Sequence, residues 1–279
     1  MGETKNRMKL HILGTAAAEG IPAMGCGCST CRVARERGGR NIRSRSAAVV
    51  DDVLKIDFGP DTLYHIHRDR LDPTRWKWIL FTHAHDDHCL ESELGYLLPP
   101  FAPPETCERV TLYGSDAILE RIARITHWQS ERAVSTQRLE AFVPIDLGAY
   151  HVLPVRARHA ENQECFNFVV ESAGRRLLYA CDTGWYPQET WDALKDASLH
   201  AVVLECTYGF GDATHTNHLG VQSFVKMRDE LDSIDALASD CRFLASHFSH
   251  NGGALQDALE SALGPHGVDV AFDGLVLEV

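Results

Sequence analysis

The segment His83-Ala84-His85-Asp86-Asp87-His88 places three imidazoles and two carboxylates within six residues. It follows the apolar run 76–81, which predicts a strand, so the histidines lie where that strand ends and a loop opens. On extended backbone, the side chains of His83 and His85 project to the same side and can reach one metal ion. The last two residues of the segment come as the chain turns toward a predicted helix start at 89–92, and they indicate a second position nearby. Histidine and aspartate suit Zn²⁺, Mn²⁺ or Fe²⁺.

Strand-like runs recur along the whole chain, and helical patterns follow them. We expect strands at 9–14, 47–58 (two strands), 110–113, 152–157, 166–171, 176–180, 201–205, 243–246, 268–272 and 275–277. Apolar residues at helical spacing predict helices at 118–125, 221–231 and 254–263. Two sheets packed face to face, with helices outside, would bury such a set of elements. No internal repeat or clear linker is present in the 279 residues, so we expect a single domain over 1–279.

The pattern His-x-His-x-Asp-His resembles the signature of the metallo-β-lactamase superfamily of binuclear hydrolases. This resemblance implies an αββα sandwich, with two mixed β-sheets, helices outside and metal ions at the sheet edges. In that superfamily a third histidine, a bridging aspartate and a last histidine each follow a strand. His159, Asp182 and His247 occupy such positions here, because each follows a predicted strand.

The resemblance divides these donors between two catalytic ions. One ion takes His83, His85 and His159. The other takes Asp87, which also counts as a catalytic residue, together with His88 and His247, while Asp182 bridges the pair. Two cations a few ångströms apart would lower the pKa of a shared water and provide a bridging hydroxide, so the expected reaction is hydrolysis of an ester-like bond. Nitrogen and oxygen ligands accept Zn²⁺ or Mn²⁺, and the sequence leaves that choice open.

A cysteine cluster, Cys26-Gly27-Cys28-Ser29-Thr30-Cys31, predicts one further metal site. Three thiolates at this spacing suit a tetrahedral structural zinc that needs one more ligand. His250 lies three residues after His247 and is free to point away from the catalytic ions, so it would complete a Cys₃His site. The chain has nine cysteines, and because we expect no export signal, we expect them to be ligands or buried thiols more often than disulfides.

The stretch from Gly14 to Ala23, followed by Cys-x-Cys-x-x-Cys, resembles a narrower group, the phosphoribosyl cyclic phosphate phosphodiesterases of the carbon–phosphorus lyase pathway. Pyrroloquinoline quinone biosynthesis proteins share the cysteine turn, but their His-x-His-x-Asp-His segment is degraded, whereas it is intact here. The resemblance therefore favours a phosphodiesterase acting on a small, cyclic phosphodiester, and it implies a homodimer. Between 120 and 145 we match nothing, and we expect substrate specificity to depend partly on that segment.

The same resemblance predicts an acid–base pair. In these phosphodiesterases and the related tRNase Z enzymes, a glutamate and a histidine lie near the scissile phosphate. Glu205 ends a predicted strand and His218 stands at the expected start of a helix, so His218 would bind the phosphoryl group or protonate the leaving oxygen while Glu205 orients it. Two alternatives are that His215 takes this role or that His218 only caps the helix. Asp57 matches a superfamily aspartate that supports the metal loop.

The charge and hydropathy of the chain limit which molecules we expect it to bind. The formal net charge is −12, and basic residues are enriched only around Arg40, Arg43 and Arg45, which argues against binding long nucleic acid. A small phosphorylated substrate fits better, and tRNA processing is disfavoured. No apolar run approaches the length of a membrane span and the N-terminus lacks the apolar block of a signal peptide, so we expect a cytoplasmic protein without a membrane partner.

Two other functions remain open at the level of sequence. A thioester, lactone or β-lactam hydrolase on the same scaffold would share the His-x-His-x-Asp-His core. A metal-binding accessory protein of cofactor biosynthesis would fit the quinone-pathway resemblance. The intact ligand set argues against the accessory role, and the cysteine cluster with the Glu205–His218 pair argues for phosphoryl chemistry.

Overall fold

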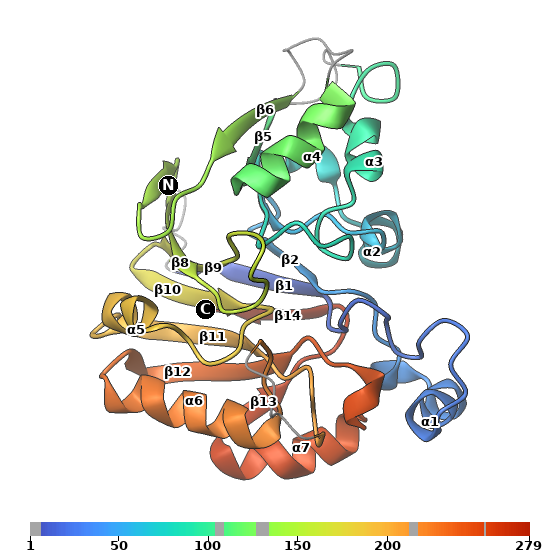
Figure 1. The fold of residues 1–279 in the computed structure, drawn as a ribbon, viewed down its shortest axis with the longest axis vertical. Coiled ribbons are helices and arrows are strands. Elements are labelled where there is room, and N and C mark those ends of the chain that lie inside the picture. Colours follow the sequence, from blue (N-terminus) through green and yellow to red (C-terminus); the bar gives the residue numbers. More distant parts are fainter. Residues whose placement is uncertain (1–6, 104–108, 127–133, 212–216, 254) are drawn as a thin grey trace, which may run out of the picture.

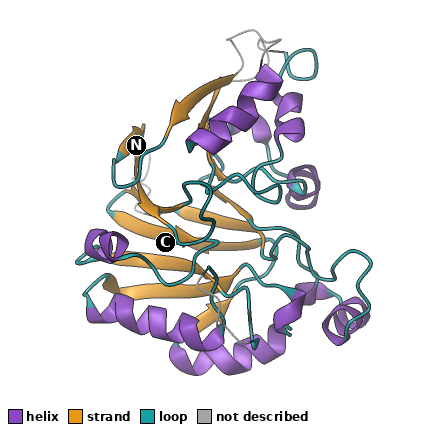
Figure 2. Cartoon of the chain, in the orientation of Figure 1, coloured by secondary structure: helices purple, strands orange, loops and turns teal. Residues whose placement is uncertain are grey.

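Two seven-stranded β-sheets lie face to face and helices cover their outer faces (Figures 1 and 2). The computed structural model describes residues 7–103, 109–126, 134–211, 217–253 and 255–279. Each sheet combines antiparallel pairs with a run of parallel strands. The protein therefore has the αββα architecture with two mixed sheets that the sequence predicts. Among the described residues, no helix is both long enough and apolar enough to cross a bilayer.

The first sheet has the strand order β14-β1-β2-β3-β4-β5-β6. Its strands from β3 to β6 run parallel to one another. The strand bounds are β1 (Lys9–Gly14), β2 (Ala47–Val50), β3 (Leu54–Ile56), β4 (Trp78–Leu80), β5 (Val110–Gly114), β6 (Val134–Arg138) and β14 (Leu275–Glu278).

The second sheet has the order β13-β12-β11-β10-β9-β8-β7, and its strands from β10 to β13 are parallel. The strand bounds are β7 (Ile145–Leu147), β8 (Tyr150–Arg156), β9 (Phe166–Ser172), β10 (Arg175–Ala180), β11 (Leu199–Glu205), β12 (Leu237–Ser246) and β13 (Val268–Val270).

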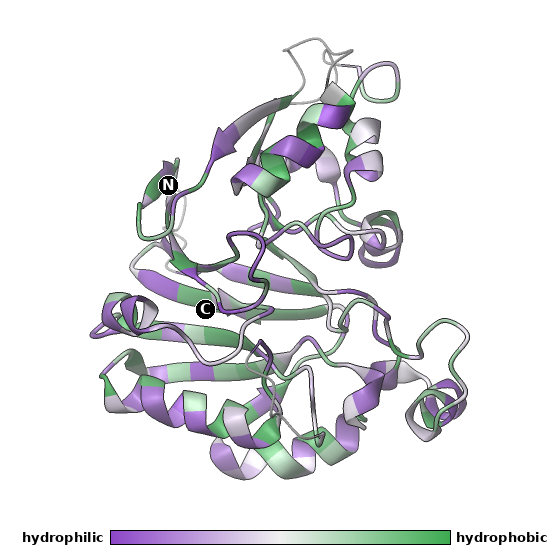
Figure 3. Cartoon of the chain, in the orientation of Figure 1, coloured by the Kyte–Doolittle hydropathy of each residue, from purple (hydrophilic) through white to green (hydrophobic). Residues whose placement is uncertain are grey.

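Helices pack on the outside of both sheets. The first sheet is covered by α2 (Thr62–Asp69), α3 (Glu91–Leu94) and α4 (Asp116–Thr126). The second is covered by α5 (Gln188–Leu194), α6 (Val221–Ser233) and α7 (Gln256–Leu263), while α1 (Ser29–Arg37) lies to one side (Figure 1). Short 3₁₀ turns lie at Gly39–Asn41, Pro73–Arg75, Gly95–Leu97, His250–Gly252 and Gly264–His266. Hydrophobic and hydrophilic residues mix along α4 and α6 (Figure 3), as expected for helices with one face on a sheet.

The central strands are apolar on both faces because both faces are covered. In β2, Ala48 and Val50 pack between the sheets, whereas Ala47 and Val49 face the outer helices. The strand β11 alternates in the same way between the two hydrophobic clusters on its two sides. Residues on these strands are therefore held from both sides, and the loops at their ends start from fixed positions.

Most predicted elements are present, with corrections at their ends. The strand expected over 76–81 is limited to β4, and the helix expected from 254 begins at Gln256, residue 254 itself lying outside the described residues. Five elements have no counterpart in the prediction: α1, α2, α5, β6 and β7. The strand β6 is half-buried to exposed along its length, and α1 buries only Thr30, Cys31 and Ala34, so neither carries a clear apolar period.

Gly59 offers a test of how closely the loop after β3 packs on the histidine-rich loop. A Cβ at Gly59 would lie 1.9 Å from the backbone oxygen of Asp87. We expect Gly59→Ala to lower the free energy of unfolding by about 1–3 kcal/mol, the usual effect of overpacking, and to displace the Asp87 peptide. Gly264→Ala is the control, because a Cβ there meets nothing within 4 Å. Thermal unfolding of both variants measures the difference, and equal stability would show that the two loops do not pack as described.

Candidate metal centre

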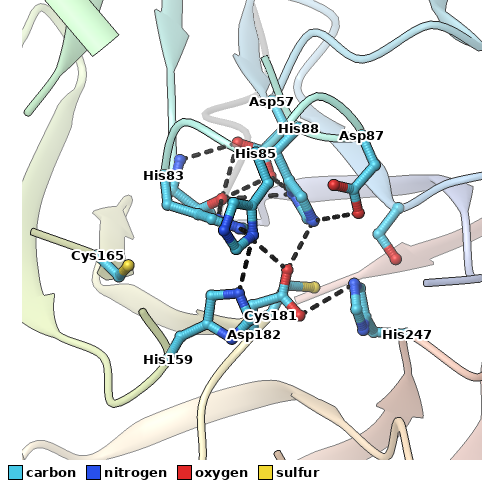
Figure 4. A network of polar contacts seen from close by, with 12 residues as sticks. Asp57, His83, His85, Asp87, His88, His159, Cys165, Cys181, Asp182 and His247 are labelled. Carbon is cyan, nitrogen blue, oxygen red and sulfur yellow. Dashed lines mark hydrogen bonds and ion pairs between the residues drawn. The ribbon is translucent and has the colours of Figure 1, made fainter. Parts of the chain in front are cut away.

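The predicted donors lie in loops at one edge of the sandwich. The loop 83–88 follows β4, and the loops after β8, β10 and β12 carry His159, Asp182 and His247. Since β10 and β12 both run parallel to β11, their carboxyl ends meet at the same edge, the usual place for sites in such sheets. Residues more than 160 positions apart in the chain thus come together (Figure 4).

One set of donors, which we call the first donor cluster, consists of His83, His85 and His159. His83 Nε2 is 2.8 Å from His85 Nδ1, and His159 Nε2 is 3.1 Å from the same Nδ1. Three ligand atoms around a tetrahedral zinc lie about 3.3 Å apart, given zinc–nitrogen bonds of about 2.0–2.1 Å. The three imidazoles therefore converge at the spacing that a single cation requires.

The second donor cluster consists of Asp87, His88, Asp182 and His247. His88 Nε2 is 3.1 Å from Asp87 Oδ2 and 2.7 Å from Asp182 Oδ2, while His247 Nε2 is 3.2 Å from Asp182 Oδ1. Asp182 Oδ2 is also 3.5 Å from His83 Nε2, so this one carboxylate reaches both clusters. In Figure 4 it lies between the imidazoles of His88 and His247.

Three buried atoms in the second donor cluster show that the residues fit a cation. His88 Nε2, His247 Nε2 and Asp182 Oδ1 are almost completely buried, and despite their contacts of 2.7 to 3.2 Å within the cluster they make no hydrogen bond of good geometry among the described residues. A buried polar atom without a partner is unfavourable by about 1–3 kcal/mol. A divalent metal ion binds the lone pairs of imidazole nitrogens and of carboxylate oxygens, so one ion would satisfy these three atoms together.

Burial and neighbouring charges set the protonation of the cluster residues. Burial, together with the nearby His88, holds the pKa of His83 well below its usual value. Burial also opposes charge on His88, but the Asp87, Asp57 and Asp182 carboxylates outweigh it and raise the pKa of His88 well above the usual value. Burial likewise opposes ionisation of Asp182, but His247 and His88 lower its pKa. The Asp182 carboxylate is therefore ionised, and it favours positive charge on the atoms around it.

Four of the five imidazoles are held at their other ring nitrogen. Such contacts orient a metal-binding histidine and select its tautomer. The Nδ1 contacts are Thr82 Oγ1 for His83 at 3.0 Å, Asp57 Oδ2 for His88 at 2.7 Å, Thr207 Oγ1 for His247 at 2.9 Å and Asn217 O for His159 at 3.4 Å. The sequence predicts the Asp57 contact alone. Thr82 and Thr207 are ordinary strand-end residues in sequence, and only the fold shows what their hydroxyl groups contact.

Backbone strain marks the same loops. Asp57, Asp182 and His247 each follow a strand and have φ angles of 61°, 54° and 55°. Non-glycine residues rarely adopt this left-handed conformation, although Asp and His do so more often than most. Such residues persist where the surrounding structure fixes them, which is frequent at functional sites.

Glu205 and His218 form a hydrogen-bonded pair beside the donor clusters. His218 Nδ1 is 2.7 Å from Glu205 Oε1 and 3.5 Å from Asp182 Oδ1. Burial opposes charge on the imidazole, but the Glu205 carboxylate outweighs it and raises the pKa of His218 to about 9. The fully buried Glu205 also accepts hydrogen bonds from the backbone N–H groups of Thr183, Thr207 and Leu219, at 3.0, 2.9 and 3.1 Å, so it ties three loops together.

The placement of His218 on a helix is wrong. The helix α6 begins at Val221 with Gly220 as its N-cap, so His218 lies in the preceding loop and does not cap the helix. The competing candidate, His215, lies outside the described residues. The glycine at 220 already provides an N-cap, which frees the preceding segment to turn toward the donor clusters.

The cysteine cluster forms a separate group with His250. His250 Nδ1 is 3.7 Å from Cys26 Sγ and 3.4 Å from Cys28 Sγ, and a ligand atom of Cys31 lies within 4.8 Å of each of the others. The Cys28 thiol caps α1 by accepting a hydrogen bond from the backbone of Cys31, and this contact together with His250 lowers the pKa of Cys28 to about 6. Three thiols and one imidazole at these distances suit a tetrahedral zinc.

The comparisons with known proteins agree with this fold. Residues 54–239 match the family described as Beta-lactamase superfamily domain. The chain is 26% identical over 268 residues to the Coenzyme PQQ synthesis protein B of Methylobacterium radiotolerans, covering 83% of this chain and 85% of that protein. A diphosphatase from the PhnP family has a similar structure, with a TM-score of 0.79 and 23% identity over 98% of both chains. Zn²⁺-bound PqqB from Methylobacterium extorquens has a TM-score of 0.73 and 19% identity over 97% of this chain and all of the other.

The matched region, from 54 to 239 inclusive, spans 186 of the 279 residues. The chain therefore belongs to the β-lactamase superfamily domain family. The fold, the family and the converging histidine and aspartate donors identify a metal-dependent hydrolase of the metallo-β-lactamase type.

The cysteine cluster allows a test that leaves the other donors untouched. We expect Cys28→Ser to lose one tightly held zinc per chain and to unfold at a lower temperature, because a thiolate-rich site contributes its binding energy to folding. Cys241→Ser is the control, since that half-buried thiol lies outside the cluster. Zinc analysis after mild chelation, followed by thermal unfolding, measures both effects. A Cys28→Ser protein with full zinc content and unchanged stability would rule out the site.

Proposed function

We propose that the protein is a binuclear metal-dependent phosphodiesterase that hydrolyses a small phosphodiester, cyclic or otherwise compact. The observation that carries the proposal is the Glu205–His218 pair beside Asp182, because it adds an acid–base group to a set of donors for two ions. His218 belongs to groups of ligand-type atoms with residues of both donor clusters. A substrate bound at the clusters would therefore meet this imidazole.

The residues of the site have separate tasks in this proposal. Two divalent ions bound at the donor clusters, Zn²⁺ or Mn²⁺, would make hydroxide available at neutral pH and offset negative charge on the substrate oxygens. Asp182 spans both clusters and fixes their separation. The Nδ1 atom of His218 is held by Glu205, which leaves Nε2 to face the substrate and donate a proton to the leaving oxygen.

Phosphodiester chemistry gains more from this arrangement than acyl chemistry does. A phosphodiester is an anion and its leaving alkoxide needs a proton, so a positively charged imidazole helps at both points. A neutral lactone, thioester or β-lactam presents no such anion. We therefore place acyl hydrolysis second, and the substrate panel below separates the two.

The proposed partner is a small phosphorylated molecule. The formal net charge of −12 disfavours long nucleic acid, which binds to basic surfaces. The similarity to a PhnP-family diphosphatase supports phosphorus–oxygen bond cleavage. A homodimer stays a prediction that rests on the family resemblance.

A third candidate function is a role in coenzyme biosynthesis. The 26% identity to Coenzyme PQQ synthesis protein B favours it. The converging histidines and aspartates support a hydrolytic role instead, because they match the ligand pattern that the superfamily resemblance implies.

Removing the imidazole of His218 tests the proposed function. We expect His218→Ala to keep its metals and its fold but to lose roughly a hundredfold or more in turnover of an alkyl phosphodiester, the usual scale for a general acid. A nitrophenyl ester should lose less, because nitrophenolate leaves without a proton. His151→Ala is the control, since His151 is an exposed residue of β8 paired with Asp146.

The same assay decides between the candidate functions. Metal-loaded wild-type protein is offered cyclic phosphodiesters, a bis-aryl phosphate, a thioester and a lactone. Good cleavage of the lactone or thioester with no phosphodiester turnover would contradict the proposal. Equal and negligible losses on both phosphodiesters in His218→Ala would remove His218 from the reaction.

A further inference from the structure

His85 differs from the other imidazoles of the site in how it is oriented. It faces the first donor cluster with Nδ1, which is 2.8 Å from His83 Nε2 and 3.1 Å from His159 Nε2. The other imidazoles face the clusters with Nε2 and are held at Nδ1. The described part of the chain supplies no hydrogen-bond partner for Nε2 of His85, and the residue is exposed. No hydrogen bond at Nε2 from the described residues therefore fixes the orientation of this ring.

The position of His85 must then come from its backbone. Nδ1 is bonded to the ring carbon that joins Cβ, so it lies closer to the main chain than Nε2 does. A shift of the main chain at residue 85 therefore displaces the ligand atom directly. Side-chain contacts fix this stretch of main chain on two sides.

Arg121 and Gln163 hold the backbone on either side of Ala84. The N–H of Ala84 donates a hydrogen bond of 2.7 Å to Gln163 Oε1. The carbonyl of Ala84, which belongs to the peptide that joins it to His85, accepts a hydrogen bond from Nη1 of Arg121. Arg121 Nη2 also contacts Asp86 Oδ1 at 2.6 Å, so the guanidinium contacts both neighbours of His85.

The guanidinium of Arg121 is itself held in place. It extends from α4, is only 15% exposed, and its Nε donates a 2.9 Å hydrogen bond to Glu91 Oε2 in α3. A planar guanidinium with several fixed donors positions its partners more firmly than a flexible ammonium would. The contacts join two helices to the loop that carries four of the predicted ligands.

We propose that Arg121 and Gln163 are positioning residues that fix the peptide groups around Ala84 and thereby place Nδ1 of His85 for metal binding. This inference rests on the metal centre proposed above. It also gives a role to the start of the segment 120–145, for which the sequence offers no family match: Arg121 serves the metal loop rather than the substrate.

The test compares Arg121→Gln with Arg124→Gln. Arg124 lies on the same helix and is 3.8 Å from the same Glu91, but it is 67% exposed and makes no contact with Ala84 among the described residues. Metal affinity is measured by competition with a chromophoric chelator, and the ligand geometry is followed by the absorption of Co²⁺-substituted protein. We expect Arg121→Gln to lower the affinity for one catalytic ion roughly 10–100-fold and to change the Co²⁺ spectrum, as is usual when a supporting contact is lost.

The controls separate positioning from folding. The zinc of the cysteine cluster and the affinity of Arg124→Gln should remain at wild-type values, and Arg121→Lys should recover only part of the loss because it cannot reach both neighbours of His85. If Arg121→Gln does not fold, Gln163→Met removes the other contact, whereas Gln163→Glu retains an acceptor. Only Gln163→Met should then lower the affinity for the ion.

Wild-type affinity and spectrum in Arg121→Gln, or in Gln163→Met where that variant is needed, would overturn the inference. A wild-type protein that binds no ion at the histidine clusters would instead overturn the proposed metal centre. The competition experiment on wild-type protein distinguishes these two failures before any variant is compared.

Discussion

The site depends on the contacts that the Asp182 carboxylate makes with the surrounding imidazoles. This carboxylate lies within 2.7 to 3.5 Å of nitrogen atoms of His83, His88, His218 and His247, which come from three separate loops. Asp57, Asp87 and Glu205 each contact one of these imidazoles, but Asp182 is the carboxylate that contacts all four. Around it, they converge on the positions that divalent cations would take. Asp182 therefore contacts loops that follow strands of both sheets.

The sandwich makes that convergence possible because it delivers strand ends to one edge. Covered on both faces, the strands are fixed, and the residues just beyond them adopt conformations that few side chains tolerate, as at Asp57 and Asp182. Behind the donors lies a layer of hydrogen bonds from threonine hydroxyls and the buried Glu205, which connects three loops. The residues that hold the donors also hold the loops, so a substitution among them alters both the donor positions and the loop conformations.

The residues that the sequence predicts as donors converge in the structure because they stand in short local patterns at strand ends, as in the segment from His83 to His88. It also predicts the sandwich, since strands covered on both faces are continuously apolar. It does not predict contacts made by ordinary residues across long separations: nothing in the sequence around Thr207 or Arg121 indicates what they contact. Edge strands such as β6 and the polar helix α1 were missed because little of their surface is buried. The apolar spacing predicts the helix α6 from 221, where it begins, but the expectation that His218 opens it is wrong, because a glycine N-cap lacks the side-chain signal that most N-caps provide.

The most direct test of this account is to locate the metals in crystals of the Mn²⁺-loaded protein by anomalous scattering. The account predicts two manganese peaks a few ångströms apart, one at His83, His85 and His159 and one in the second donor cluster, with the Asp182 carboxylate between them. A single peak, or two peaks that Asp182 does not contact, would contradict it.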